Sequence, residues 1–403
     1  MTRRAVITGI GAVTPLGLTA EDTIKAMQAG VCAIGSLDIR DADRLTNPIG
    51  AQIKGFDPAA HFTRSELALY DPSTQFSLVS AQQAAAQAGL AEAKIDPTRM
   101  GVIMGSGGGG ISTIEDSYRT VFEEAKNRVH PFTVPKLMAN AASSQISMKH
   151  GARGPVFTVS SACASSNHAM AQALFLIRSG AADVVLTGGA DAMLTFGGLK
   201  GWEGLRVMSG DGCRPFCATR NGMVQGEGAA VFVLEAEDHA KARGAEPLVA
   251  LAGAAMTSDA ADIVMPNQEG AARAMVQAVE DAGLAAKDIA YVNAHGTATA
   301  ANDRIECAAL REAFGKAAEE MAISSTKSLH GHCMGGTGAI EALAVISALR
   351  DWLIPPTGGW CEPDPACDLD IVTNTARPTA ATAALSNAFA FGGLNAVLAF
   401  SKK

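Results

Sequence analysis

The sequence predicts an α/β protein built from two related halves. Apolar, β-branched runs alternate with segments rich in alanine, glycine and serine, as expected of buried strands and closely packed helices. A similar order of strand, small-residue turn and helix occurs twice. With 403 residues, the chain is long enough for two domain-sized units. We therefore expect one half over residues 1–245 and a second over residues 246–403.

The strands and helices of the first half follow from apolar patterning. Runs typical of buried strands lie at residues 6–9, 101–105, 184–188 and 230–234. Helical segments are expected between them, notably over 75–88 and 164–179. Because strands that alternate with helices are typical of βαβ units, we expect the strands to be largely parallel.

Two internal similarities suggest the duplication. Residues 88–94 end a helix and precede a strand near residue 101, and residues 282–287 do the same before a strand at 291–294. Residues 159–163 open a long helix, and residues 323–327 open a segment that becomes helical by about Gly338. Each similarity is short, but the two occur in matching order, which favours a duplicated fold.

Composition narrows the function classes. The net charge is −8, and no tract rich in lysine or arginine is present, so we expect no nucleic-acid partner. Glycine is abundant, at 42 residues, and aromatic residues make up only 5%. This composition favours close backbone packing, with helices of small residues sandwiched between sheets.

The sequence contains no clear membrane span, secretion signal or metal-binding motif. No run reaches the roughly 18 apolar residues of a membrane helix, so we expect no membrane span. Arg3 and Arg4 precede an apolar run that could imitate a secretion signal, but its glycines and β-branched residues favour a first buried strand and a cytoplasmic protein. The eight scattered cysteines do not form a disulfide framework, and neither Cys213 with Cys217 nor the cluster at 330–333 has the spacing of a metal site.

Cys163 is the candidate nucleophile. It follows an apolar strand and lies at the expected start of a helix, where the helix dipole would lower the thiol pKa. Its neighbours are small, which would admit a large thioester. A buried cysteine in a tight turn remains the alternative on local chemistry alone.

Two histidines lie in loops that follow strands, where active-site residues of α/β folds gather. His295 is followed by Gly296, and His332 is preceded by Gly331. Lys327, five residues before His332, could supply positive charge or could pair at the surface. Any single histidine is more often structural, but two in equivalent loops beside a candidate thiol favour catalysis.

A glycine turn near the C-terminus is the fourth candidate element. Phe389 and Phe391 precede Gly392 and Gly393, and such a turn can direct backbone amides inward as an oxyanion hole. An ordinary turn between the last two strands is the alternative.

Together these stretches resemble the β-ketoacyl-[acyl-carrier-protein] synthases, the decarboxylating condensing enzymes of fatty acid and polyketide synthesis. The resemblance covers nearly the whole chain and rests on four motifs in the family's order, at residues 161–165, 293–297, 325–332 and 389–395. It implies a thiolase-like fold, with duplicated βαβαβαββ halves stacked as a five-layer αβαβα sandwich, and a homodimer.

The resemblance also implies roles for the motif residues. Cys163 would take the acyl chain from its carrier thioester, while His295 and His332 would assist decarboxylation of malonyl thioester and stabilise the enolate. Lys327 would hold and polarise the site. The backbone N–H groups of Cys163 and Phe391 would form the oxyanion hole, and Phe391 would gate the acyl pocket.

Further positions match supporting residues of the family. Thr297 and Thr299 would hydrogen-bond the phosphopantetheine arm, and Phe389 would lie beside the substrate. Asp303 and Glu306 would form a supporting acidic pair, with Glu341 as a buried carboxylate near Lys327. The resemblance implies no metal and no cofactor, because the phosphopantetheine arrives on the acyl carrier protein, and the substrates are malonyl and acyl thioesters.

The sequence departs from the usual type II pattern in ways that suggest a sub-branch. The last turn has Ala390 and Leu394 where glycine and threonine are usual. The run over residues 328–333, followed by that over 386–390, resembles the nodulation-type ketosynthases, which make specialised acyl chains. Gly108 and Thr133 stand where the family commonly carries isoleucine and phenylalanine. Both changes remove bulk, so we expect a longer or differently shaped acyl pocket.

Some alternatives stay open. Housekeeping fatty acid synthesis competes with a specialised acyl or polyketide pathway. A non-elongating partner subunit of a ketosynthase heterodimer is less favoured, because Cys163, His295 and His332 are intact, and a hydrolase or acyltransferase using Cys163 is remote. Since the carrier protein is acidic and so is this chain, we expect a local basic patch at the pocket mouth, with Arg206 and Arg153 as candidates.

Overall fold

The structure, a computed structural model, describes residues 3–402 and is organised around one mixed sheet of ten strands. The strand order is β10-β9-β13-β14-β8-β1-β7-β6-β4-β5. Their bounds are β1 Ala5–Val13, β4 Met100–Gly105, β5 Val156–Val159, β6 Val184–Ala192, β7 Glu227–Ala236, β8 Val249–Ser258, β9 Ile289–Asn293, β10 Ala322–Ser324, β13 Ala383–Ala390 and β14 Leu394–Ser401. Two small hairpin-like sheets pair β2 (Ile34–Ser36) with β3 (Ile49–Ala51) and β11 (Leu353–Ile354) with β12 (Arg377–Pro378).

The sheet consists of two five-stranded halves with the same order. The N-terminal half runs β5-β4-β6-β7-β1, and the C-terminal half runs β10-β9-β13-β14-β8. They join where β1 pairs antiparallel with β8, with Ala5 opposite Leu251. The matching order agrees with a duplicated fold, while the boundary between residues 245 and 246 stays a prediction.

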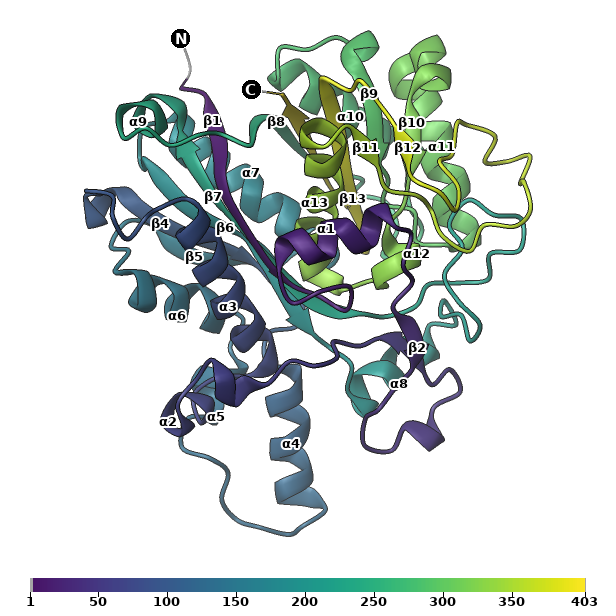
Figure 1. Cartoon of the computed structure of the whole chain (residues 1–403). Coiled ribbons are helices and arrows are strands. Elements are labelled where there is room, and N and C mark those ends of the chain that lie inside the picture. Colours follow the sequence, from purple (N-terminus) through teal and green to yellow (C-terminus); the bar gives the residue numbers. More distant parts are fainter. Residues whose placement is uncertain (1–2, 403) are drawn as a thin grey trace.

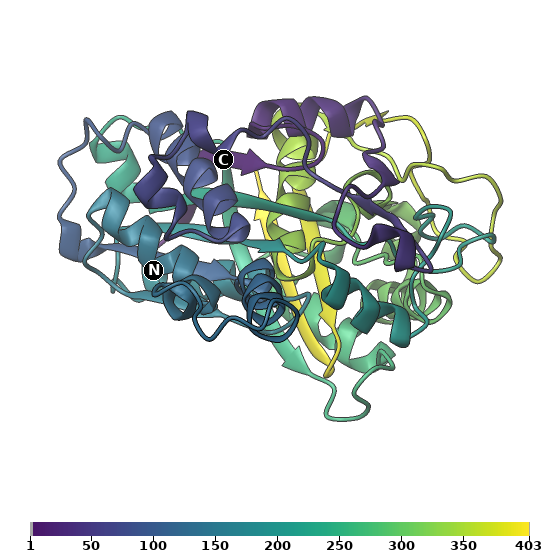
Figure 2. The same ribbon diagram turned by 90° about the horizontal axis from the view of Figure 1, so that it is seen from below.

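The layers are those of the predicted sandwich (Figures 1 and 2). Helices α7 (Ser165–Arg178) and α13 (Thr337–Arg350) each contact strands of both halves and form the central layer. Helices α3 (Pro72–Gln87) and α6 (Ala141–His150) pack on the N-terminal half. Helices α10 (Gln268–Asp281) and α11 (Ala300–Phe314) belong to the outer layer of the C-terminal half. The predicted five-layer fold is therefore confirmed.

The remaining helices are shorter or lie outside this framework. They are α1 (Ala20–Gln28), α2 (Arg64–Leu67), α4 (Ile111–Phe122), α5 (Thr133–Leu137), α8 (Phe196–Gly204), α9 (Glu237–Ala242) and α12 (Lys327–His330). The predicted helices over 75–88 and 164–179 are confirmed as α3 and α7. Helix α3 begins earlier than predicted because Asp71 caps it and Pro72 occupies its first turn. Over residues 3–402, the structure contains no helix with the length and apolarity needed to span a membrane.

The prediction of largely parallel strands was wrong. Five of the neighbouring pairs in the large sheet are antiparallel and four are parallel. The reason is that helices cover both faces of each half. A strand covered on both faces is apolar whichever way it runs, so apolar runs report burial rather than direction.

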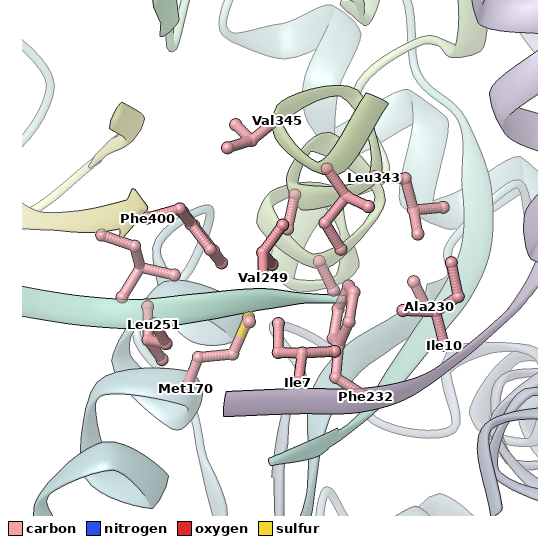
Figure 3. Close-up of a cluster of buried hydrophobic side chains, with 14 of the residues drawn as sticks. Ile7, Ile10, Met170, Ala230, Phe232, Val249, Leu251, Leu343, Val345 and Phe400 are labelled. Carbon is pink, nitrogen blue, oxygen red and sulfur yellow. The ribbon is translucent and has the colours of Figure 1, made fainter. Parts of the chain in front are cut away.

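Small residues allow the central layer to form. A Cβ added at Gly105, the last residue of β4, would lie 2.4 Å from the backbone of Ser165 at the start of α7. One added at Gly338 on α13 would lie 2.0 Å from Asn167 on α7. Helix α13 is buried throughout from Thr337 to Leu349. Figure 3 shows the core where these helices meet the strands; its labelled residues are Ile7, Ile10, Met170, Ala230, Phe232, Val249, Leu251, Leu343, Val345 and Phe400.

Candidate active site

The predicted catalytic residues meet at one cavity. The loops after β5, β9 and β10 converge with the turn between β13 and β14, bringing together residues far apart in the chain. Cys163, His295, His332, Phe389 and Phe391 all line this cavity. The four motifs identified from the sequence therefore form a single site.

Cys163 lies in a tight turn between β5 and α7. Ala162, just before it, has a left-handed backbone with φ of +50°, and α7 begins at Ser165, so Cys163 precedes the helix. Only 7% of Cys163 is exposed. The prediction of a lowered thiol pKa was wrong, because burial raises the pKa of Cys163 to about 12 and the charge of Lys327 offsets this only in part. Burial therefore favours the neutral thiol of this candidate nucleophile.

His295 and His332 form a buried pair. Their ring centroids lie 5.8 Å apart and their planes are almost perpendicular, at 88°. Burial, followed by the positive charge of Lys327, holds the pKa of each imidazole well below its usual range. Both side chains are therefore neutral at pH 7 and can donate a hydrogen bond without carrying a charge.

The surroundings of His332 define which nitrogen carries its proton. The backbone N–H of Met334 donates to His332 Nδ1 at 3.0 Å, and the Thr337 hydroxyl lies 3.0 Å from the same atom. An Nδ1 that accepts from an amide cannot carry the proton of a neutral ring, so the proton sits on Nε2. His332 is thereby prepared as an Nε2–H donor.

Lys327 and Glu341 form a buried ion pair that contacts the backbone of the His295 loop. Lys327, at the start of α12, donates to the backbone carbonyl of His295 and to Glu341 on α13, both at 2.5 Å. Lys327 is fully buried and Glu341 almost so. Burial raises the pKa of Glu341 to about 7 even with the lysine beside it. The pair links the loop of His295 to the central layer.

Asp303 and Glu306 organise the His295 loop from α11. Glu306 accepts the backbone N–H groups of His295 and Gly296, both at 2.8 Å. Asp303 accepts the N–H of Phe216 at 2.8 Å and of Ala298 at 3.2 Å. The two carboxylates thus hold the turn by its amides, as expected of a supporting acidic pair.

Thr297 and Thr299 line the same cavity. Their hydroxyl oxygens are 2.9 Å apart, and Thr299 also caps α11 by accepting the N–H of Asn302. A pair of neighbouring hydroxyls on the cavity wall suits a ligand with amide groups, such as a pantetheine arm.

The turn between β13 and β14 closes the site. The ring of Phe389 lies 6.0 Å from that of His295, and Phe391 stacks on Trp202 with centroids 5.9 Å apart. Gly392 and Gly393 adopt positive φ, and their amides already donate to Ile263 and Ala390. The role of the Phe391 amide as an oxyanion donor stays a prediction.

Gly108 and Thr133 do not line this cavity. Gly108 follows β4, and a Cβ added there would lie 3.0 Å from Met193 Sδ and 2.9 Å from Ile111. Thr133 begins α5 and is buried. Met193 therefore occupies the neighbourhood that the missing isoleucine side chain would enter, and a longer acyl pocket stays a prediction.

The two candidate arginines lie in different places. Arg206 is exposed and immediately precedes Val207, which lines the cavity, but Arg206 itself is not part of the lining. Arg153 precedes β5, whereas Cys163 follows that strand. Arg153 was therefore a wrong candidate, because it lies at the opposite end of the strand from the site.

Two residues that support the site, Asp191 and Trp202, were not predicted from the sequence. Asp191, at the end of β6, accepts from the Ser106 hydroxyl and from the amides of Gly107, Gly108 and Gly335. It ties the loop after β4 to the segment that follows His332. Trp202 packs on Phe391 from α8. A charged residue within the small-residue run 188–192 was the available signal for Asp191.

A buried cysteine beside two neutral imidazoles, on a duplicated five-layer fold, defines an acyl-transferring enzyme of the thiolase-like class. Comparison of the chain with models of known protein families identifies its family. The model of the β-ketoacyl synthase N-terminal domain matches residues 2–240, and that of the C-terminal domain matches residues 248–360. The chain belongs to the β-ketoacyl synthase family.

Whole-length relatives agree. Nodulation protein E of Rhizobium sp. (strain N33) is 46% identical over 400 residues, which cover 99% of each chain. The 3-oxoacyl-[acyl-carrier-protein] synthase 2 of Staphylococcus aureus (strain COL) is 38% identical over 407 residues, covering 99% of this chain and 98% of the relative. A type II PKS acyl-carrier protein in complex with its ketosynthase bound to the hexaketide provides a solved structure with a TM-score of 0.90, 27% identity and full coverage of both chains. The chain is a β-ketoacyl-[acyl-carrier-protein] synthase, an elongating condensing enzyme.

Proposed function

We propose that this synthase carries out decarboxylative Claisen condensation with Cys163 as the acyl acceptor and with His295 and His332 as the enolate-stabilising pair. The observation that carries the assignment is the geometry of the histidine pair, whose rings lie 5.8 Å apart in the cavity that Cys163 also lines. Two buried imidazoles are held neutral, and His332 has its donor nitrogen fixed by the Met334 amide. Neutral donors aimed at a developing oxyanion lower the barrier without an ion pair to break.

The first half-reaction loads the enzyme. Cys163 Sγ attacks the carbonyl carbon of an acyl thioester, and the bond from that carbon to the carrier sulfur breaks. The thiol proton of Cys163 ends on the departing carrier thiol, so the exchange is neutral overall. Because burial keeps the resting Cys163 protonated, proton transfer accompanies attack instead of preceding it. The amides of Cys163 and Phe391 receive the oxyanion.

The second half-reaction makes the carbon–carbon bond. Malonyl thioester loses carbon dioxide, and hydrogen bonds from His295 and His332 stabilise its thioester oxygen as enolate charge develops. The carbanion attacks the acyl carbon on Cys163, the bond from that carbon to Sγ breaks, and the departing Cys163 thiolate takes up one proton from solvent. The product is a β-ketoacyl thioester longer by two carbons. Lys327 holds the His295 loop in place during both steps.

The partners follow from the same site. Thr297 and Thr299 would hold the phosphopantetheine arm, which the acyl carrier protein brings, so the reaction draws on no further cofactor. Arg206, exposed beside the cavity-lining Val207, is suited to an acidic carrier surface. We also propose that the chain divides into its two halves between residues 245 and 246. We further propose that the enzyme is cytoplasmic.

A homodimer is supported by one apolar face. Edge strand β5, helices α4, α5 and α6, and the residue that follows α5 present exposed apolar side chains, namely Tyr118, Phe122, Val134, Met138, Met148 and Phe157. Phe122 alone is 78% exposed. A patch of this kind beside an open sheet edge is typical of a protein interface.

We assign the enzyme to specialised acyl synthesis. Its identity to nodulation protein E exceeds its identity to the 3-oxoacyl-[acyl-carrier-protein] synthase 2, at 46% against 38%. Gly108 and Thr133 remove bulk relative to the family pattern. Gly108→Ile should shorten the longest primer that the enzyme accepts, and an unchanged primer range would refute the pocket assignment.

The test is reconstitution with a ladder of acyl carrier proteins and malonyl-carrier protein, with products weighed by intact mass spectrometry. We expect chains that grow by two carbons, and no acylation of Cys163→Ala. If no primer is elongated and the protein instead captures a second ketosynthase-like chain, the partner-subunit interpretation replaces ours. The preferred primer separates housekeeping from specialised synthesis.

A further inference from the structure

Two cysteines outside the active site face each other across two loops. Cys217 lies between α8 and β7, and Cys361 lies between β11 and β12. They are 144 residues apart in sequence, yet their sulfur atoms are 3.6 Å apart. Cys217 is buried, whereas Cys361 is exposed. A backbone bridge between Cys217 and Pro363 holds the two loops together.

The surroundings of Cys217 favour its thiolate. The backbone N–H groups of Cys361 and Glu362 donate to Cys217 Sγ at 3.5 and 3.3 Å. The Thr219 hydroxyl lies 3.3 Å from each sulfur. Burial opposes ionisation, but these hydrogen bonds outweigh it and lower the pKa of Cys217 below that of a free thiol. Cys217 therefore has the environment of a reactive cysteine.

A second cysteine pair provides a contrast within the same loop. Cys367, six residues after Cys361, hydrogen-bonds Cys307 on α11. Both are buried, and the hydrogen bond and burial raise the pKa of Cys307. Neither cysteine of this pair is exposed and its thiolate is not stabilised, whereas the first pair reaches solvent through Cys361.

We propose that Cys217 and Cys361 are a modification site, where peroxides form a reversible disulfide between the two loops. The Cys217 thiolate attacks a peroxide oxygen and breaks the O–O bond, which gives a sulfenic acid and releases hydroxide, or an alcohol from an organic peroxide. The Cys361 thiol then attacks that sulfur, and water leaves as the S–S bond forms. Two thiols are oxidised and one peroxide is reduced, and a dithiol reductant reverses the change.

The pair lies close to the site's supporting structure. Phe216 donates its N–H to Asp303, the carboxylate that also holds the Ala298 amide. Arg220 pairs with Asp364 and donates to the Cys217 carbonyl. The disulfide would thus join two loops that already converge on the segment carrying Thr297 and Thr299.

The test uses full-length Cys163→Ala protein, so that the catalytic thiol does not contribute. After treatment with hydrogen peroxide and alkylation under unfolding conditions, we expect two fewer alkylated cysteines and a Cys217–Cys361 link in the peptide map. Dithiothreitol should restore both alkylations. Cys361→Ser in the same background should abolish the link, while Cys367→Ser should retain it.

Other outcomes overturn the proposal. These are an unchanged count of alkylated cysteines, a link between Cys307 and Cys367 alone, or sulfinic acid on Cys217 with Cys361 still free. Cys213 shares the loop and is buried, so Cys213→Ser is a matched control that should form the link normally. The readout is mass alone, so it does not depend on the proposed condensation.

Discussion

The two halves of the molecule share a strand order but carry different chemistry at equivalent positions. In the N-terminal half, the loop after β5 carries Cys163 and leads into α7. In the C-terminal half, the loop after β10 carries Lys327 and His332 and leads into α13. The framework places both loops at one cavity. In the proposed mechanism, one half supplies the nucleophile and the other stabilises the negative charge that develops.

The electrostatics of the two loops differ accordingly. Cys163 lies in a turn of small residues and stays uncharged because burial dominates. The C-terminal half instead buries the Lys327–Glu341 ion pair close to two neutral histidines. The two loops therefore occupy equivalent positions in the duplicated fold, but they differ in charge. One contains a neutral thiol, and the other contains a buried ion pair beside neutral histidines.

The largest expected effect concerns the N-terminal loop. Cys163→Ser should lower the elongation rate by roughly 10⁴-fold or more, because the covalent intermediate needs a sulfur nucleophile and a thiolate leaving group. Rapid-quench measurement of product formation checks this. Cys333→Ser, a change of a buried cysteine outside the cavity lining, serves as the control and should elongate normally. A Cys163→Ser rate within tenfold of wild type would remove Cys163 from its role.

The next effect concerns the C-terminal loop. His332→Ala should slow condensation by about 10²–10³-fold, the usual cost of losing one preorganised oxyanion donor. Acyl loading of Cys163 should persist, as read by intact mass. His330→Gln alters the same loop two residues away and should retain the rate. Loss of loading in His332→Ala would show that the two halves do not divide the reaction as proposed.

The buried ion pair should matter for stability as well as geometry. Lys327→Met would leave Glu341 buried without its cation, which should lower the free energy of unfolding by about 3–5 kcal/mol. Glu341→Gln added to that variant should recover part of the loss, because the unpaired carboxylate is then gone. Urea unfolding of the two variants measures both values. Equal stability of the single and double variants would contradict a coupled pair.

A smaller effect should appear as pH falls. Burial lowers the pKa of His330 to about 3, against an ordinary value of 6.5. Below pH 6.5, His330 binds a proton in the unfolded chain but stays neutral in the folded chain. The contribution of His330 to the free energy of unfolding is therefore fully present above pH 6.5 and is lost as the pH falls. Between pH 7 and 5 the advantage of wild type over His330→Gln should shrink by about 2 kcal/mol. A difference independent of pH would place the folded pKa of His330 near its ordinary value.

Much of the fold and the site could be predicted from local patterns. Small-residue turns between apolar strands and helices indicated Cys163, His295 and His332, and the abundance of glycine predicted small-residue helices packed closely between sheets. Strand direction could not be predicted, because helices bury both faces of the sheet and so remove the alternation that distinguishes antiparallel strands.

The chemistry of individual groups depended on contacts across the chain. The pKa of Cys163 follows from burial against residues such as Met334 and Ala390, which lie far away in sequence. The supporting role of Asp191 depends on its hydrogen bond from the backbone N–H of Gly335, which lies 144 residues away in sequence. Local sequence showed a thiol before a helix, but not how completely the other half would exclude water from it.

The most direct test of the division between halves is to separate the two half-reactions in one experiment. Cys163→Ala and the double variant His295→Ala/His332→Ala would each be given malonyl-carrier protein and an acyl-carrier protein. We predict that Cys163→Ala still releases carbon dioxide from malonyl-carrier protein but is never acylated, and that the double variant is acylated but releases none. Acylation and decarboxylation lost together in both variants would contradict the account.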